Sequence, residues 1–279
     1  SDAYCWICHC DGSGVCCELC PRLYHIKCLP QNPSSESWVC LECQKIIMAE
    51  TLETRPLAMQ SISVDTLCIL LKYVLQRMKL PETKPFHQPV DCGAVPSYTD
   101  YVFHPMDFAT IDKNIKKKFY GSPEAFVADF KWILHNCVVF NGKNHSLTTV
   151  AKTIVKMCCH EVNELLICPD CYLNSCIKDS DDWFCEPCRI PHTLVWAKMK
   201  GYPYWPAKVL REDNNGQVDV RFFGEHDRAW VPLNQVFLLS INPPSLVPKK
   251  TKGYDEAKVE LIRHVQLLRF VFLFIHHYC

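Results

Sequence analysis

Cysteine and histidine residues crowd the first 43 residues of the chain at spacings that suit metal binding. They occur mostly as Cys-x2-Cys pairs with a single histidine in fifth place, in this order: Cys5, Cys8, Cys17, Cys20, His25, Cys28, Cys40 and Cys43. Each pair places two donor atoms on one side of a tetrahedral zinc ion, and one ion takes four donors. Eight donors therefore predict two zinc ions. Cys10 and Cys16 lie beside the pairs, and the spacing makes them bystanders.

A second cysteine group lies in the middle of the chain. Its two pairs, separated by 13 residues, are Cys168 with Cys171 and Cys185 with Cys188. Four thiolates are enough for one closed zinc site, which we expect to be a structural clamp between two domains. Cys176 lies between the pairs and is expected to be a buried spectator, whereas Cys158 and Cys159 could compete as ligands.

The composition bounds the class of protein. The chain has 279 residues, enough for two or three domains, and twenty of them are cysteine. A secreted disulfide scaffold is one explanation of that count, but the first residues lack the apolar core of a signal peptide and the pairing favours intracellular zinc. The formal net charge is zero, which argues against a general nucleic-acid binder. No internal apolar run reaches the roughly 18 residues of a membrane span.

Two regions differ in their hydrophobic period. From Ser63, a plausible N-cap, apolar residues recur at helical spacing, and we expect further helices near 107–119, 123–140 and 147–166. A proline-rich stretch separates the first two. Four helices with one long loop predict an antiparallel bundle. Residues 192–242 instead read as short strands with an Asn-Asn-Gly turn at 214–216, which predicts a small β-barrel followed by a helix.

The first cysteine group resembles a PHD finger. In that family the first and third ligand pairs share one zinc and the second and fourth share the other. This implies one site from Cys5, Cys8, His25 and Cys28, and one from Cys17, Cys20, Cys40 and Cys43. PHD fingers commonly bind histone H3 tails, and Asp11 and Glu18 would favour the cationic end of such a peptide. A purely structural finger with ordinary surface acids is the alternative.

The helical region resembles a bromodomain. The segment from Lys84 to Val90 is similar to the Trp-Pro-Phe shelf of that family, with Lys84 in place of the tryptophan, and residues 104–108 and 136–141 also match. The resemblance implies a pocket for acetyl-lysine, in which Asn141 bonds the acetyl carbonyl and Tyr98 holds a water molecule. Its walls would come from Phe86, Val90, Val95, Phe140 and the gatekeeper Leu147. Alternatively, Asn141 is only a helix cap before Gly142.

The strand region resembles a PWWP domain, because Pro203-Tyr204-Trp205-Pro206 matches its eponymous motif. The resemblance implies a methyl-lysine cage of Tyr202, Trp205 and Phe222, held by cation–π attraction. Between residues 189 and 253 there are ten lysines and arginines against five acids, which suits phosphate contacts. The candidates for DNA contact are Lys198, Lys200, Lys208 and Arg211. The rings could instead be barrel core, and the charges a solvated face.

These modules predict a multidomain α+β chain. We expect a PHD-type finger at 1–45, a packed linker at 46–62, a left-handed four-helix bromodomain bundle at 63–167, a four-cysteine zinc clamp at 168–190, a PWWP β-barrel at 191–245, and a C-terminal helix and tail at 246–279. The order resembles the chromatin-reader cassette of the protein kinase C-binding protein 1 family of MYND-type zinc-finger proteins, although the tail from about His264 departs from it.

The resemblance implies a non-enzymatic nuclear chromatin reader with three zinc ions. Its partners would be histone H3 and H4 tails, nucleosomal DNA and transcriptional corepressor proteins, with no membrane and no small-molecule substrate. Two alternatives stay open. One is a zinc-dependent E3 ubiquitin or SUMO ligase, since RING fingers interleave their ligand pairs in the same way. The other is a scaffold with vestigial pockets.

Overall fold

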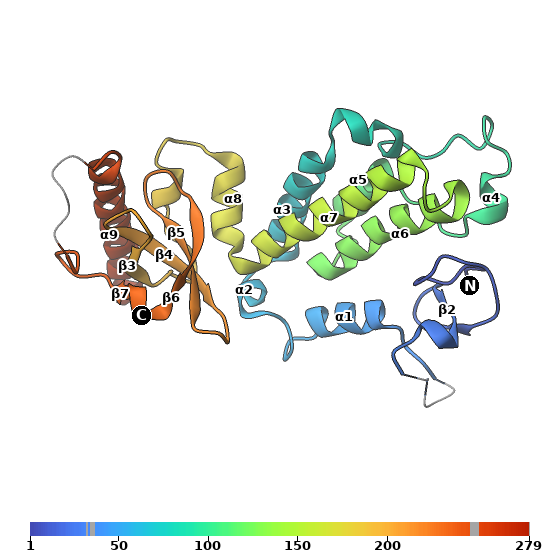
Figure 1. Ribbon diagram of the computed structural model, residues 1–279, viewed down its shortest axis with the longest axis horizontal. Coiled ribbons are helices and arrows are strands. Elements are labelled where there is room, and N and C mark those ends of the chain that lie inside the picture. The colour runs from blue at the N-terminus through green and yellow to red at the C-terminus, as the bar shows by residue number, and fades with distance from the viewer. Residues whose placement is uncertain (32, 34–36, 246–250, 279) are drawn as a thin grey trace. The chain divides into compact units, whose positions relative to one another are not determined.

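The computed structural model describes residues 1–31, 33, 37–245 and 251–278. The chain forms two compact units, Ser1–Leu166 and Ile167–Cys279 (Figure 1). Part of the expected C-terminal segment, residues 246–250 and Cys279, lies outside the described residues. Among the helices of the described part, none is long and apolar enough to cross a membrane.

The first unit begins with a finger that has very little regular structure. Strand β1 (Val15–Cys16) pairs antiparallel with β2 (Leu23–Tyr24), and the short 3-10 helix η1 (Ile26–Cys28) follows. Helix α1 (Leu41–Glu50) starts immediately after Cys40, whose thiol accepts a hydrogen bond from the Cys43 amide at its first turn. Two-residue strands cannot bury enough apolar surface to fold alone, so the finger depends on its metal ligands.

The rest of the first unit is a helical bundle. Its elements are α2 (Leu57–Gln60), α3 (Val64–Met78), η2 (Pro81–Phe86), α4 (Tyr98–Tyr101), α5 (Phe108–Lys116), α6 (Pro123–Asn141) and α7 (Ser146–Ile167). Side chains of Ser63, Asp107 and Ser122 accept amide hydrogen bonds at the starts of α3, α5 and α6. Leu70, Phe108 and Phe126 are fully buried between the helices. The four long helices lie side by side in Figure 1.

The finger packs on helix α6 through aromatic rings and a buried cation. Trp6 of the finger lies edge-on to Trp132 of α6, with ring centroids 4.6 Å apart. The Arg22 guanidinium lies 4.3 Å from the Trp6 ring and 5.0 Å from the Trp132 ring, and it donates to the Ala128 carbonyl. The two rings therefore share one cation. Because the guanidinium is buried, its cation–π attraction to the rings is stronger than it would be in water.

A buried polar chain completes this contact. The Asp2 carboxylate lies 3.0 Å from Nε2 of His135 on α6, and both side chains are almost fully buried. Nδ1 of His135 lies 2.9 Å from Nδ1 of His9 in the finger. Buried polar groups cost free energy unless they are paired, so this chain fixes one arrangement of the finger on α6.

The second unit joins a short helix to an antiparallel sheet. Its elements are α8 (Pro169–Ile177), η3 (Trp183–Cys185), β3 (Leu194–Lys198), β4 (Tyr204–Glu212), β5 (Gln217–Phe222), β6 (Arg228–Pro232), η4 (Leu233–Gln235), β7 (Val236–Leu238) and α9 (Tyr254–Tyr278). The strand order is β6-β5-β4-β3-β7. Val195, Val220 and Val231 fill the barrel interior. Helix α9 packs against β4 and η3 and covers Trp196 and Phe223.

Removal of the Asp2 carboxylate should destabilise the first unit. In Asp2→Ala the buried Nε2 of His135 loses its partner, and an unpaired buried polar group costs about 1–3 kcal/mol. We expect a lower midpoint of thermal unfolding, followed by circular dichroism. Asp11→Ala, which changes an exposed acid of the same finger, is the control and should unfold like the parent. Equal midpoints for both variants would contradict a stabilising role for this chain of polar groups.

Candidate metal centres and binding pockets

The finger brings its eight predicted ligands together in two groups. One contains Cys5, Cys8, His25 and Cys28, and the other contains Cys17, Cys20, Cys40 and Cys43. Within each group all donor atoms lie within 4.8 Å of one another, as four ligands of one ion must. The interleaved pairing implied by the PHD resemblance is therefore the pairing in the structure.

Local contacts favour the thiolate form of one of these ligands, Cys40. A hydrogen bond from Cys20 lowers the pKa of Cys40 to about 4, and the thiolate is the form that binds metal. Gly12 adopts φ +136°, and a Cβ there would lie 3.0 Å from Nε2 of His25. The ring of this ligand thus needs glycine beside it.

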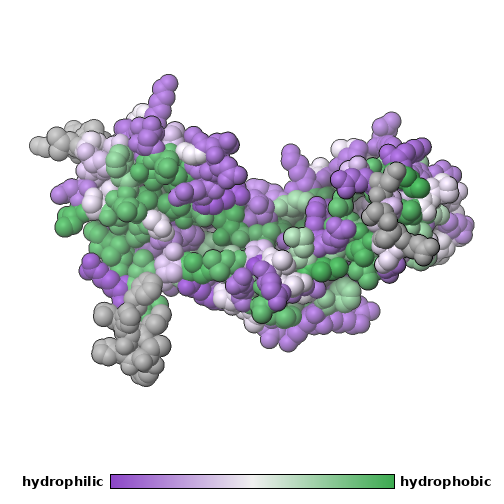
Figure 2. Space-filling view, turned by 90° about the horizontal axis from the view of Figure 1, so that it is seen from below, coloured by the Kyte–Doolittle hydropathy of each residue, from purple (hydrophilic) through white to green (hydrophobic). Residues whose placement is uncertain are grey.

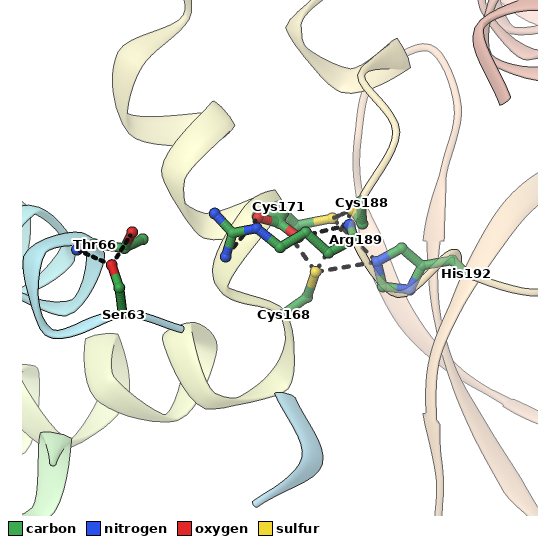
Figure 3. A network of polar contacts seen from close by, with 8 residues as sticks. Ser63, Thr66, Cys168, Cys171, Cys188, Arg189 and His192 are labelled. Atoms are coloured by element: carbon green, nitrogen blue, oxygen red, sulfur yellow. Dashed lines mark hydrogen bonds and ion pairs between the residues drawn. The ribbon is translucent and has the colours of Figure 1, made fainter. Parts of the chain in front are cut away.

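The third group lies wholly within the second unit (Figure 3). It contains Cys168, Cys171, Cys188 and His192, again with all donor atoms within 4.8 Å. Nε2 of His192 lies 3.2 Å from Sγ of Cys171 and 3.3 Å from Sγ of Cys168. Its Nδ1 donates to the Val209 carbonyl at 2.8 Å, which fixes the tautomer and leaves Nε2 available for a metal.

The sequence-based prediction of Cys185 as the fourth ligand was wrong. Cys185 ends η3, and its buried thiol donates instead to the Glu260 carbonyl of α9 at 3.3 Å. Its backbone is part of a segment whose Phe184 is anchored in the core under α9. The missed ligand was visible as a histidine four residues after Cys188, a common zinc spacing.

These donor sets fit zinc in each case. Four nitrogen and sulfur donors at mutual contact distance match a closed tetrahedral site. The chain therefore has three zinc sites, two in the finger and one in the second unit. Because protein donors fill all four positions, these sites stabilise structure and leave no position for a substrate.

A cavity of about 220 Å³ opens in the helical bundle. Its lining includes all seven residues expected for the acetyl-lysine pocket: Phe86, Val90, Val95, Tyr98, Phe140, Asn141 and Leu147. The backbone brings them together from η2, the long loop, α4, the end of α6 and the start of α7. The lining is mostly apolar, with few polar groups, as expected of a small-ligand site.

Two polar groups of this cavity are set by their surroundings. The Asn141 amide donates to Sγ of Cys137 at 3.5 Å, while Gly142, with φ +89°, is the residue that caps α6. Burial raises the pKa of Tyr98 to about 12, so its hydroxyl stays protonated. The Tyr98 ring packs edge-on against Phe140 at 5.1 Å. Lys84, in place of the shelf tryptophan, is exposed and is absent from the lining.

The barrel brings together two of its three expected cage residues. Tyr202 is 59% exposed, and its ring centroid lies 6.2 Å from that of Trp205. The Trp205 indole donates to the Phe223 carbonyl and packs edge-on against Tyr254 of α9, a neighbour that sequence reasoning missed. Phe222 is only 9% exposed and belongs to the barrel core. Phe222 could therefore contact a ligand only from beneath, and the side walls of a cage would have to come from the other two rings.

The expected DNA-contact residues separate into two kinds. Lys198 and Lys200 lie at the β3–β4 hairpin beside Tyr202, and Lys200 is exposed. The assignment of Lys208 to DNA was wrong, because its side chain is 1% exposed and its ammonium donates to the Phe184 carbonyl at 2.6 Å. The Arg211 guanidinium already binds the Asp219 carboxylate at 3.1 Å. The sequence gives the number of positive charges but does not show which side chains are exposed and which are bonded within the unit.

Both expected acids of the finger are exposed. Asp11 forms an isolated antiparallel bridge with Tyr4. Glu18 accepts a hydrogen bond from Ser37 at 2.8 Å, and its amide donates to the Trp38 carbonyl. Within the described residues, β1 pairs with β2 alone, so its other edge is open to an added peptide strand.

The third metal site can be tested by exchange of single ligands. We expect three zinc ions per folded chain, measured by mass spectrometry of the metal. His192→Ala should lower the content to two, because the remaining three thiols cannot close a tetrahedral site. Cys185→Ala, the matched control, should keep all three ions. The reverse result would restore the four-cysteine site, and a strong chelator should unfold the finger in every variant.

Comparison with known proteins agrees with this architecture. The bromodomain family model matches residues 70–153, and the PWWP domain model matches residues 192–266. A Drosophila melanogaster protein named MYND-type zinc finger-containing chromatin reader Zmynd8 is 36% identical over 269 residues, which is 95% of this chain and 16% of that protein.

Two other relatives match a smaller part. Proteins named E3 ubiquitin-protein ligase TRIM33 from Xenopus laevis and Danio rerio are 32% and 28% identical, each over 50% of this chain. The chain spans 16% or less of the length of these three relatives. Three zinc sites, two matched reader domains and similarity along nearly the whole chain show that it belongs to the family of MYND-type zinc-finger chromatin readers that combine a PHD finger, a bromodomain and a PWWP domain.

Proposed function

We propose that this chain acts in the nucleus as a multivalent, non-enzymatic reader of modified nucleosomes. Its finger would bind the histone H3 tail, its bundle an acetylated lysine of H3 or H4, and its barrel a methylated lysine together with DNA. The observation that carries the proposal is the bundle cavity, because seven residues from five segments meet there as acetyl-lysine recognition requires.

The chemistry of this cavity supports a neutral acyl group as its ligand. Acetyl-lysine has an apolar stem and one amide, so it needs apolar walls and a single directed donor. Asn141 supplies an amide donor at the cavity, and the hydroxyl of Tyr98 supplies a second polar group for a bridging water. An unmodified lysine would bring a charge into the slot without a carboxylate to pair with it, since Asp107 is occupied as the N-cap of α5.

The finger supports peptide binding by strand addition. The open edge of β1 offers main-chain groups, and the exposed carboxylates of Asp11 and Glu18 lie within a few residues of it along the chain. Cationic lysines and the amino terminus of a histone tail complement such charges. We assign no trimethyl-lysine cage to the finger.

The barrel supports joint recognition of a methylated lysine and a phosphate backbone. Tyr202 and Trp205 present two aromatic faces, and Lys198 and Lys200 lie on the same hairpin. A ring contributes about 1–2 kcal/mol to a bound cation, which is too little for firm binding alone. Neighbouring phosphate contacts would add the rest.

Exposed apolar surface on the second unit supports a protein partner, which we propose to be a transcriptional corepressor. Figure 2 shows hydrophobic residues gathered over one face of this unit, at the left. The exposed large hydrophobic residues of the second unit as a whole include Phe237, Leu238, Val259 and Ile262. Apolar patches of this kind commonly mark interaction sites.

The sites support binding over catalysis. Each metal group of the described residues has a full set of four protein donors, which leaves no open coordination position for chemistry. The ligase activity in the names of the two TRIM33 relatives belongs to those proteins, which match only half of this chain. We therefore place recognition, and not ubiquitin transfer, as the function of this segment.

The acetyl-lysine proposal is tested by Asn141→Ala. Loss of the amide leaves the acetyl carbonyl unpaired in a dry slot, at a cost of about 1–3 kcal/mol, or roughly a tenfold to hundredfold weaker Kd. Binding of acetylated H3 and H4 tail peptides is measured by calorimetry. Asn144→Ala, in the exposed loop after α6, is the control and should bind normally. Unchanged affinity in a folded Asn141→Ala chain would refute the pocket assignment.

The barrel proposal is tested by two separable sets of variants. Tyr202→Ala and Trp205→Ala should remove the preference for methylated over unmodified nucleosomes, and bare duplex DNA should still bind. The double charge reversal Lys198→Glu and Lys200→Glu should weaken duplex binding and its salt dependence. The double reversal Lys156→Glu and Lys258→Glu, at exposed lysines of α7 and α9, makes the same change in net charge and is the control.

Tyr202 gives the clearer result of the two cage residues, because Trp205 also packs on Tyr254. A methyl preference that survives Tyr202→Ala and Trp205→Ala in folded protein would show that these rings are only packing. Equal duplex affinity for the parent and the double reversal would remove the hairpin from the DNA contact.

A further inference from the structure

The outer face of strands β4, β5 and β6 carries a row of charged and aromatic side chains. Arg211 lies opposite Asp219, and Asp219 lies opposite Trp230, in the antiparallel register. Their neighbours Val218, Val220 and Val231 fill the barrel interior. Because successive side chains on a strand point to opposite faces, this row points away from the core.

A buried carboxylate holds two guanidinium groups on this face. The Asp219 side chain is fully buried, and it accepts from Nε of Arg211 at 3.1 Å and from Nε of Arg228 at 2.7 Å. One negative charge therefore fixes two positive ones and leaves a net positive charge. Guanidinium groups held in this way present a fixed plane with further N–H donors.

Aromatic rings lie at both ends of the row. The Arg211 guanidinium lies 5.2 Å from the ring of Trp230, which is 43% exposed. At the other end the Arg221 guanidinium lies 5.5 Å from the ring of Trp183 in η3, and the Lys178 ammonium lies 5.3 Å from the same ring. We name as the Arg–Trp strip the residues Trp183, Arg211, Asp219, Arg221, Arg228 and Trp230.

We propose that the Arg–Trp strip binds single-stranded nucleic acid. Arg211 and Arg228 carry two positive charges against the one buried carboxylate that binds them both, and this pair offers a net positive surface for phosphates. The exposed indole of Trp230 and the fixed guanidinium of Arg211 offer flat surfaces on which unpaired bases stack. In a duplex the base faces are stacked on one another and cannot stack on a side chain. An acidic peptide has no base that could stack on the exposed indole. Both are therefore poorer matches than a single strand.

The strip is separate from the duplex contact proposed above. Arg211 lies seven residues further along β4 than Tyr204, which pairs with Lys198 at the hairpin. At about 3.3 Å per residue this separates Arg211 from the hairpin by roughly 20 Å, whereas Arg221, which pairs with Lys208, lies nearer to the hairpin. The proposal thus does not rest on the methyl-lysine cage, and either can fail alone.

Fluorescence anisotropy with labelled oligouridine and oligothymidine tests the strip in the zinc-loaded full chain. Trp230→Ala should weaken binding about tenfold, since one base–aromatic stack is lost. Arg211→Lys keeps the charge but removes the plane, and it should weaken binding in the same direction. Zinc content and the unfolding temperature verify that each variant is folded.

The controls separate the other occupants. Lys198→Glu with Lys200→Glu should leave oligouridine binding nearly unchanged, while Trp230→Ala should leave duplex binding nearly unchanged. Unchanged oligouridine affinity in folded Trp230→Ala would overturn the proposal. So would a parallel loss of duplex affinity in that variant, which would make the strip a duplex contact. Displacement of oligouridine by polyglutamate of equal charge at equal concentration would show that charge alone is read, and would overturn it too.

Discussion

Closed four-ligand metal coordination is the constraint on which both units of this chain depend. The finger has two strands of two residues each, so apolar burial alone cannot fix its path. Ligation by Cys40 and Cys43 also fixes the start of α1, the helix that packs along α6. In the second unit His192 binds the third group with one nitrogen and the Val209 carbonyl of β4 with the other. The metal thus ties the α8 segment to the barrel.

Helix α6 contacts the finger with one face and lines the cavity with another, because the helical period of about 3.6 residues separates the two sets of side chains. Trp132 and His135 face the finger, where they meet Trp6, Arg22 and Asp2. Ile133, Cys137 and Asn141 follow one another at four-residue spacing and line the cavity. The residues that orient the finger and the residues that line the cavity therefore share one rigid element. A site built on a helix in this way holds its geometry better than a site built on a loop.

Local patterns carried most of the prediction from sequence. Ligand spacing, helical period and the Asn-Asn-Gly turn are each set by a few neighbouring residues, so the eight finger ligands and the bundle helices could be read directly. Cys185 completed a four-cysteine set by spacing alone, and the sequence did not show that its side chain points away from the group, because that direction depends on how η3 packs under α9. Helix α8 was missed although Cys168 caps it and Pro169 opens it, a recognisable start.

The number of lysines and arginines in the second unit does not predict how many positive charges are available to DNA, because several are buried or paired. The basic excess of the second unit includes Lys208, which bonds a carbonyl inside the unit, and Arg211 and Arg228, which share one carboxylate. Of the four expected DNA contacts, Lys198 and Lys200 therefore remain. Each phosphate contact adds about 0.9 to the logarithmic salt slope of binding, so two lysines would give the proposed duplex contact only modest strength. Tyr202 is exposed and Trp205 is half-buried, so the two rings that we propose as a cage would also hold a methylated lysine weakly. Under the proposed function, firm attachment to chromatin would come from several weak sites engaged on one nucleosome, where linkage raises the effective concentration of each.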